Sequence, residues 1–180
     1  MHMYDMYVPL TAEVTEKYDF ETAFSTVCEA LSPLGSEYAE LLRRAKTERW
    51  MDVYETENKR SGAYSWGCYG THPYVLLNHE GTLHDVFTIA HELGHAMHSH
   101  YSNAALPHTK AGYAIFVAEV ASTVNEVLTL KYLLGKATDS ATRKYLLGYY
   151  LDMFRTTLFR QTMFAQFELC LLYTSDAADE

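Results

Sequence analysis

The sequence has few cysteines, few basic residues and no long apolar run. Its three cysteines, Cys28, Cys68 and Cys170, are an odd number without paired spacing, which argues against a disulfide framework and a cysteine-bound metal and predicts reduced thiols in the cytoplasm. Lysine and arginine total 14 against 23 acidic residues, and the net charge of −9 argues against nucleic acid as a partner. No stretch approaches the roughly 20 apolar residues of a membrane helix, so no membrane contact is expected.

What remains is an ordinary globular composition, with 48% hydrophobic and 21% charged residues, and no internal repeat. The periodicity predicts a mainly α fold with a small β-ribbon or edge sheet. Asp19 and Thr82 are suitable N-caps for two of the helices. The expected helices are about 20–32, 36–48, 83–101, 113–134 and 140–169, the expected strands are 63–66 and 73–78, residues 1–10 are expected to be extended, and 50–54 fits either a strand or a helix end.

The most informative stretch is His91-Glu-Leu-Gly-His95. Two histidines four residues apart project from one face of a helix, and Glu92 reaches the same pocket. His91 and His95 would hold a zinc ion, and Glu92 would take a proton from the metal-bound water. The same pattern also occurs on exposed helices as a salt-bridged surface. The apolar residues around this one indicate a buried helix, in which the polar atoms need a partner such as a metal.

A catalytic zinc takes three protein ligands and keeps one position open. Glu119 is the candidate third ligand, because it lies in an apolar segment, 114–126, where an unpaired carboxylate would be costly. Glu126 is on nearly the same face and would accept a hydrogen bond from the free ring nitrogen of a liganding histidine. The alternatives are a buried ion pair for Glu119 and a solvated position for Glu126. His98 is interpreted as a support for the site or a core histidine, not as a ligand.

The segments 91–98 and 116–126 resemble oligoendopeptidase F, a branch of the thimet-oligopeptidase-like zinc metallopeptidases. Residues 59–67, 71–78 and 154–164 extend the resemblance in the same order and spacing. The resemblance implies a zincin-type helical metallopeptidase catalytic domain with one zinc ion per chain. It also implies short, unstructured peptides as substrates. The implied ligands are His91, His95 and Glu119, and the implied general base is Glu92.

Candidate substrate contacts lie before the metal helix. Residues 55–72 are rich in glycine, serine and tyrosine, which is typical of turns, whereas the resemblance favours a loop over a cleft. Pro73 predicts that the strand it begins lies at a sheet edge, where an extended peptide could pair with the backbone. His72 is a polar cleft residue or an ordinary surface histidine. The candidate substrate-binding residues are Gly62, Ala63, Tyr64, His72 and Tyr74.

Residues 1–169 are interpreted as an incomplete catalytic domain. The resembled family has a large helical region before this point and a later segment with a histidine and tyrosines. Residues 170–180 break the amphipathic pattern of the preceding helix and resemble the translation of a sequencing adaptor, so a non-native tail is expected there. A frayed acidic tail is the alternative.

The sequence therefore predicts a zinc metalloendopeptidase that hydrolyses peptide bonds in short oligopeptides through a metal-activated water. The alternative is a truncated fragment that binds zinc and catalyses nothing. A deformylase-type hydrolase lacks support because the glycine and cysteine motifs of that group are missing. A purely structural zinc module would need a fourth protein ligand, normally cysteine, and none is near. Nothing in the sequence indicates the oligomeric state.

Overall fold

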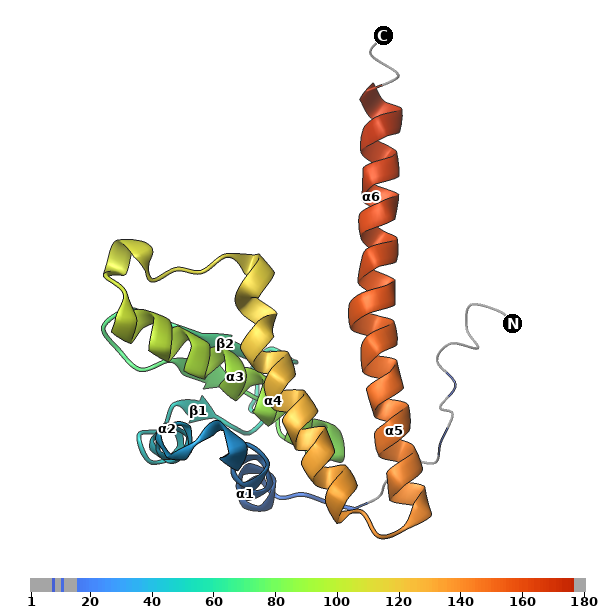
Figure 1. Cartoon of the computed structure of the whole chain (residues 1–180). Helices are drawn as coiled ribbons and strands as arrows, with labels where there is room; N and C mark the ends of the chain where they lie inside the picture. Colours follow the sequence, from blue (N-terminus) through green and yellow to red (C-terminus); the bar gives the residue numbers. More distant parts are fainter. Residues whose placement is uncertain (1–7, 9–10, 12–15, 177–180) are drawn as a thin grey trace. The chain divides into compact units, whose positions relative to one another are not determined.

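The computed structural model describes residues 8, 11 and 16–176, so most of the segment expected to be extended at 1–10 lies outside the described residues. Two compact units are present, one ending at Lys136 and one continuing from Ala137. The expected mainly α fold with a small sheet is confirmed (Figure 1). The elements are α1 (Phe20–Ala30), α2 (Ser36–Thr47), β1 (Met51–Asp52), β2 (Tyr64–Trp66), β3 (Tyr74–Leu76), α3 (Leu83–Ala105), α4 (Ile115–Lys136), α5 (Ser140–Phe154) and α6 (Arg160–Asp176).

The first unit begins with α1 and α2, which match the expected helices closely. Asp19 caps α1 as expected, because its Oδ1 accepts a hydrogen bond from the Thr22 amide at 2.7 Å. Pro33 lies in a short 3-10 turn that separates the two helices. Both helices turn an apolar face toward the interior, with Phe20, Ala23, Phe24, Val27, Leu41 and Leu42 buried.

The sheet has the order β1-β3-β2, with β3 parallel to β1 and antiparallel to β2. The expectation that the strand after Pro73 lies at an edge is therefore wrong, since β3 is the central strand. Pro73 precedes β3, which begins at Tyr74, and the Val75 amide bonds to Trp50 O at 2.8 Å. The missing N–H of proline thus falls outside the ladder and does not prevent a central position. The segment 50–54, which fitted either a strand or a helix end, contains the short edge strand β1 at Met51–Asp52.

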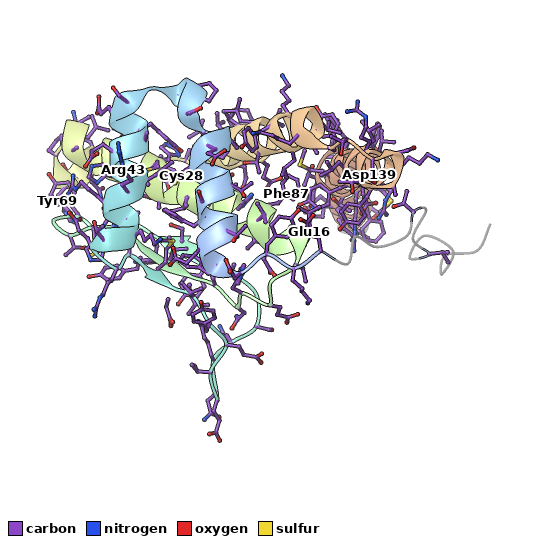
Figure 2. All side chains as sticks on the ribbon, turned by 90° about the horizontal axis from the view of Figure 1, so that it is seen from below. Glu16, Cys28, Arg43, Tyr69, Phe87 and Asp139 are labelled. Atoms are coloured by element: carbon purple, nitrogen blue, oxygen red, sulfur yellow. The ribbon has the colours of Figure 1, made fainter. Side chains whose placement is uncertain are left out.

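The central helix of the first unit is α3, and it begins with a capping box. The Asp85 amide donates to Thr82 Oγ1 at 3.2 Å, and the Thr82 amide donates to Asp85 Oδ2 at 2.7 Å. The apolar face of the helix is buried, as its sequence predicted, and Phe87, which is labelled in Figure 2, is 1% exposed. It runs four residues past the expected end because no helix-breaking residue occurs until Pro107, just after its C-cap.

Helix α4 packs along α3 through small and polar residues. Its buried residues are Ala118, Ser122, Asn125, Thr129 and Leu130. Large apolar side chains of α4 point outward instead, and Phe116 is 91% exposed. The expectation that Glu119 lies in a buried apolar environment is therefore wrong, because its side chain is 59% exposed. The apolar residues of α4 did not identify its buried face, because the close packing of two helix backbones requires small residues at the contact.

The second unit is a long helical segment. Asp139 caps α5 by accepting from the Thr142 amide at 2.8 Å, and a π-helical turn, Arg155–Phe159, joins α5 to α6. Helix α6 passes the expected end at residue 169 and continues to Asp176, since residues 170–176 contain no glycine or proline. The interpretation of 170–180 as a non-native tail stays a prediction. Among the described helices, none combines the length and the apolar character that crossing a membrane requires.

Candidate metal centre

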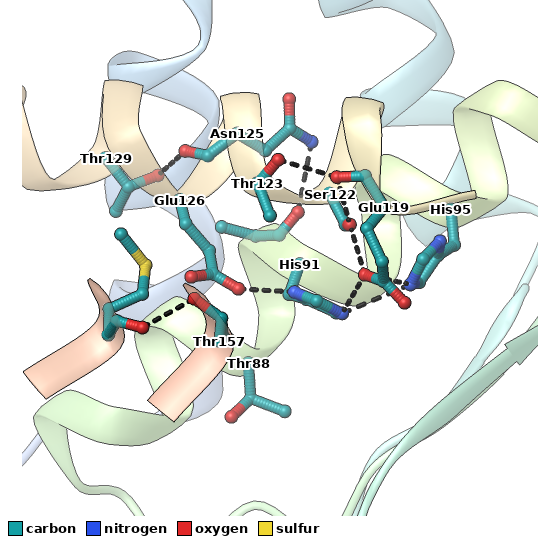
Figure 3. A network of polar contacts seen from close by, with 12 residues as sticks. Thr88, His91, His95, Glu119, Ser122, Thr123, Asn125, Glu126, Thr129 and Thr157 are labelled. Atoms are coloured by element: carbon teal, nitrogen blue, oxygen red, sulfur yellow. Dashed lines mark hydrogen bonds and ion pairs between the residues drawn. The ribbon is translucent and has the colours of Figure 1, made fainter. Parts of the chain in front are cut away.

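Three donor atoms from two helices converge on one point (Figure 3). The Nε2 atoms of His91 and His95 are 3.1 Å apart, and Glu119 Oε2 is 3.3 Å from each of them. A tetrahedral zinc ion with bonds of about 2.0–2.1 Å separates its ligands by about 3.3 Å. The Nε2 atoms of His91 and His95 and the Oε2 atom of Glu119 thus form a triangle, called the metal triangle below. It has the size and the donor chemistry of a site for a single zinc ion.

The two helices contribute to the triangle differently. His91 and His95 are one turn apart on α3, so the helix alone places both rings on one face, and both side chains are largely buried. Glu119 comes from α4 and reaches the same point only because α4 crosses α3 there (Figure 3). Because the Glu119 side chain is 59% exposed, solvent can reach the triangle, which leaves room for a further ligand such as water.

Each of the three donor side chains has a further partner. His91 Nδ1 bonds to Glu126 Oε1, which leaves Nε2 with a lone pair for a metal (Figure 3). His95 has a hydrogen bond with the backbone of Ala118. Glu119 Oε2 accepts a hydrogen bond from Ser122 Oγ at 2.8 Å. The rings and the carboxylate are therefore held in the orientations that make the triangle.

Glu92 lies beside His91 on the buried side of α3 and is 7% exposed. Burial raises the pKa of its carboxyl to about 7, with a further rise from the charges of Glu119 and Glu126 and an opposing effect of His91. Glu92 Oε2 is buried and has no hydrogen-bond partner in the described part of the chain. A carboxyl group with a pKa near neutrality and an unused oxygen can take up and release a proton efficiently.

The two histidines differ in their electrostatics. Burial lowers the pKa of His95, which favours the neutral ring that a metal requires. Burial also acts to lower the pKa of His91, but the hydrogen bond and charge of Glu126 outweigh it and leave this pKa above its usual value. A carboxylate behind a histidine ring raises the basicity of the opposite nitrogen, so Glu126 would strengthen His91 as a ligand.

Some of the predicted site residues lie in aromatic contacts outside the triangle. His98 stacks on Tyr113 with ring centroids 3.8 Å apart, and its buried Nδ1 lacks a partner among the described residues. His72 stacks on Trp50 at 5.5 Å and also contacts Tyr74 at 4.5 Å. His98 therefore packs against the loop before α4, and His72 and Tyr74 belong to a cluster around Trp50.

Two of the three remaining predicted residues border a cavity of about 500 Å³. Gly62 and Ala63 line it, together with residues 77–80, which follow β3, and the first turns of α3. The cavity extends to Thr88, which is three residues before His91. Tyr64 begins β2, and its side chain is exposed. The cavity thus lies next to the part of α3 that carries the triangle.

Sequence reasoning missed three residues that shape this centre. Ser122 bonds to Glu119, Asn125 Nδ2 donates to Ala90 O at 3.0 Å, and Gly94 lies against the backbone of α4. A signal was available, because the small or polar residues of α4 recur at positions 118, 122, 125 and 129. This spacing of three and four marks a helix face, and it identifies the face that meets α3.

Known proteins of similar sequence match most of this chain. The whole chain, residues 1–180, matches Peptidase family M3. It is 48% identical over 168 residues to Oligopeptidase PepF of Bacillus subtilis (strain 168), covering 93% of this chain and 25% of the relative. It is 45% identical over 170 residues to an oligoendopeptidase F homolog of Borreliella burgdorferi, covering 93% of this chain and 29% of the relative. The chain thus spans a quarter to less than a third of these relatives.

Solved structures likewise match this chain to one part of longer peptidase chains. A crystal structure of a candidate peptidase from Chlamydophila abortus matches 98% of this chain and 30% of its own chain, with a TM-score of 0.87 and 47% identity. Oligoendopeptidase-F from Enterococcus faecium matches 98% of this chain and 23% of its own, with a TM-score of 0.60 and 31% identity. The fold of this chain is therefore the fold of one part of these larger proteins.

Proposed function

The chain belongs to peptidase family M3, and we propose that it forms the metal-binding part of a zinc metalloendopeptidase that hydrolyses short oligopeptides. One observation carries the proposal: the donor atoms of His91, His95 and Glu119 lie within 3.3 Å of one another. The oligopeptidase and oligoendopeptidase names of the relatives support the substrate class. The three free cysteines are consistent with a reducing compartment, and we place the protein in the cytoplasm.

His91 Nε2, His95 Nε2 and Glu119 Oε2 would hold one zinc ion, since neutral imidazoles and a carboxylate are a common ligand set of catalytic zinc. When bound, zinc polarises a carbonyl group and lowers the pKa of a coordinated water. The protein contributes the orientation of the ligands. Glu126 keeps the His91 proton on Nδ1, and Ser122 directs Oε2 of Glu119 toward the two rings.

Glu92 is the proposed general base. As the water oxygen bonds to the peptide carbon, the Glu92 carboxylate takes a proton from the water. Glu92 then gives the proton to the amide nitrogen, the carbon–nitrogen bond breaks, and the products are a carboxylic acid and an amine. A pKa of about 7 for Glu92 suits both proton transfers, the uptake from water and the release to the amide nitrogen.

An extended peptide would lie along the side of the unit that carries the cavity. Gly62 and Ala63 at its border have little or no side chain, so a peptide backbone could approach them closely. Strand β3 is paired on both sides, whereas the edge strands β1 and β2 each have one side available for backbone pairing. Of these two, β2 is the strand that directly follows Gly62 and Ala63. We therefore propose Gly62, Ala63 and Tyr64 as substrate contacts. His72 and Tyr74 pack in the cluster around Trp50, and their contact with substrate stays a prediction.

The test is metal analysis followed by a peptidase assay. Purified protein dialysed against a trace of zinc should retain about one equivalent, and an internally quenched peptide should be cleaved only without chelator. Absence of bound zinc would refute the metal site. Zinc retained without any cleavage would instead support the alternative of a metal-binding unit that catalyses nothing.

A further inference from the structure

We propose that the contact between Gly94 and Ser122 sets the position of Glu119 relative to His91 and His95. Gly94 lies in α3 between the two histidines, and Ser122 lies in α4 one turn after Glu119. Both residues are buried, and Ser122 is 0% exposed. The inference rests on the proposed zinc site and assigns these two residues a positioning role in it.

Only glycine fits at position 94. A Cβ atom there would lie 2.5 Å from Ser122 Cα, 2.7 Å from Ser122 N and 2.8 Å from Ala121 O. All three are backbone atoms, so no side-chain rotation could relieve the contact. Glycine inside a helix costs about 1 kcal/mol relative to alanine, and a helix that carries one in its buried middle therefore needs a packing reason. The close approach of α4 is that reason.

Ser122 connects this backbone contact to the metal triangle. Its backbone touches Gly94, and its Oγ donates to Glu119 Oε2 at 2.8 Å and to Glu119 O at 3.0 Å. Oε2 is the oxygen that lies 3.3 Å from both histidine Nε2 atoms (Figure 3). Any outward movement of Ser122 would therefore carry the Glu119 carboxylate away from the two rings.

A second contact, one turn away, prevents α4 from sliding along α3. Asn125 Nδ2 donates to Ala90 O at 3.0 Å, and Asn125 is also bonded to the Tyr38 hydroxyl of α2. Ala90 and Gly94 are four residues apart on α3 and flank His91. A Cβ atom on Gly94 would thus force α4 either to move outward at Ser122 or to break the bond at Asn125.

The experiment compares the full chain with Gly94→Ala, Ser122→Ala and Gly135→Ala. Gly135 is a matched control, because it is also a helical glycine but nothing lies within 4 Å of the Cβ position there. The zinc dissociation constant is measured by competition with a chromophoric chelator. Thermal unfolding of the metal-free proteins and the visible absorption spectrum of the cobalt-substituted proteins are measured in parallel.

Gly94→Ala and Ser122→Ala should each weaken zinc binding by about 10–100-fold, the usual effect of losing a group that orients a ligand. Gly94→Ala should also alter the visible spectrum of the cobalt-substituted protein. Gly135→Ala should change neither the zinc affinity nor this spectrum. Wild-type affinity and spectrum in a folded Gly94→Ala variant would overturn the inference. If Gly94→Ala does not fold, Ser122→Ala decides, because it keeps the helix contact and removes only the hydrogen bond. A wild-type protein that binds no zinc would refute the proposed function itself.

Discussion

The carboxylate of Glu126 on α4 bonds to Nδ1 of His91 on α3, 35 residues earlier in the chain. An ionised carboxylate can only accept a hydrogen bond, so the proton resides on Nδ1 and the Nε2 lone pair faces Glu119. Glu126 is only 13% exposed, which keeps water from competing for this bond. One buried residue thus determines the tautomer of the first histidine in the metal triangle.

Replacing Glu126 with alanine should weaken zinc binding without removing any ligand. We expect a loss of about 10–100-fold in affinity, because His91 would no longer be held in one tautomer and orientation. The measurement is chelator competition at neutral pH. The exposed residue Glu57 provides the control substitution, Glu57→Ala, which should leave the affinity unchanged. Equal affinities in the two variants would contradict the supporting role of Glu126.

Glu92→Gln should separate catalysis from metal binding. Glutamine has nearly the same shape but cannot take a proton from water, so peptide hydrolysis should fall by at least about 100-fold. Zinc content after dialysis should stay at the wild-type level, since Glu92 is not among the three converging donors. Full activity of this variant in a quenched-peptide assay would eliminate Glu92 as the general base.

Glu119→Ala should reduce zinc affinity more strongly than the loss of Glu126. Only two donors, both from α3, would remain, and catalytic zinc sites use three. Metal analysis after exhaustive dialysis should find well under one equivalent of zinc. Lys131→Ala, an exposed change on the same helix, is the control. Unchanged zinc content in Glu119→Ala would remove this residue from the ligand set.

Glu92 should also make the stability of the metal-free protein depend on pH. Its pKa is raised from 4.5 to about 7 by burial, so between these values the folded protein keeps a proton that the unfolded chain has released. Raising the pH through this window must therefore lower the free energy of unfolding, by up to about 1.4 kcal/mol per pH unit from this group. Glu92→Gln lacks this contribution.

The measurement for this pH effect is urea unfolding of both metal-free proteins between pH 4.5 and 7. The stability of Glu92→Gln relative to wild type should rise with pH across the window. The other titrating groups are common to both proteins, so their contributions largely cancel in the difference. A difference that stays constant with pH would show that the Glu92 carboxyl has an ordinary pKa.

Lys59 should contribute to stability next to the cavity. Its side chain is nearly buried, and its Nζ donates to Tyr54 O at 2.7 Å and to Asp52 O at 3.3 Å. Lys59→Met should lower the free energy of unfolding by about 1–3 kcal/mol, because two carbonyl groups lose a charged donor. The exposed Lys110→Met is the control. Identical urea midpoints for the two variants would contradict this account.

Features that depend on neighbouring residues could be predicted from the sequence. Asp19 and Thr82 cap the helices that follow them, and the starts of α1, α2 and α3 agree with their apolar periodicity. Caps and periodicity act over one or two helical turns, so no knowledge of the tertiary fold is needed to recognise them.

Some features that depend on distant segments were predicted wrongly. The strand after Pro73 was expected at an edge, but β1 pairs with one side of it and β2 with the other. Glu119 was expected in a buried apolar environment, but α4 buries its small residues and exposes the large ones. Strand order and helix rotation depend on which partner is available, and a local pattern does not contain that information.

The sequence by itself determined that two imidazoles share one helical face with a carboxylate beside them, because 3.6 residues per turn make His91 and His95 neighbours in any α-helix. The sequence made Glu119 a candidate third donor, but only the tertiary structure brings its Oε2 to 3.3 Å from both rings. Its carboxylate arrives from a helix that crosses at Gly94, and that crossing exists because a residue without a side chain lets two backbones touch.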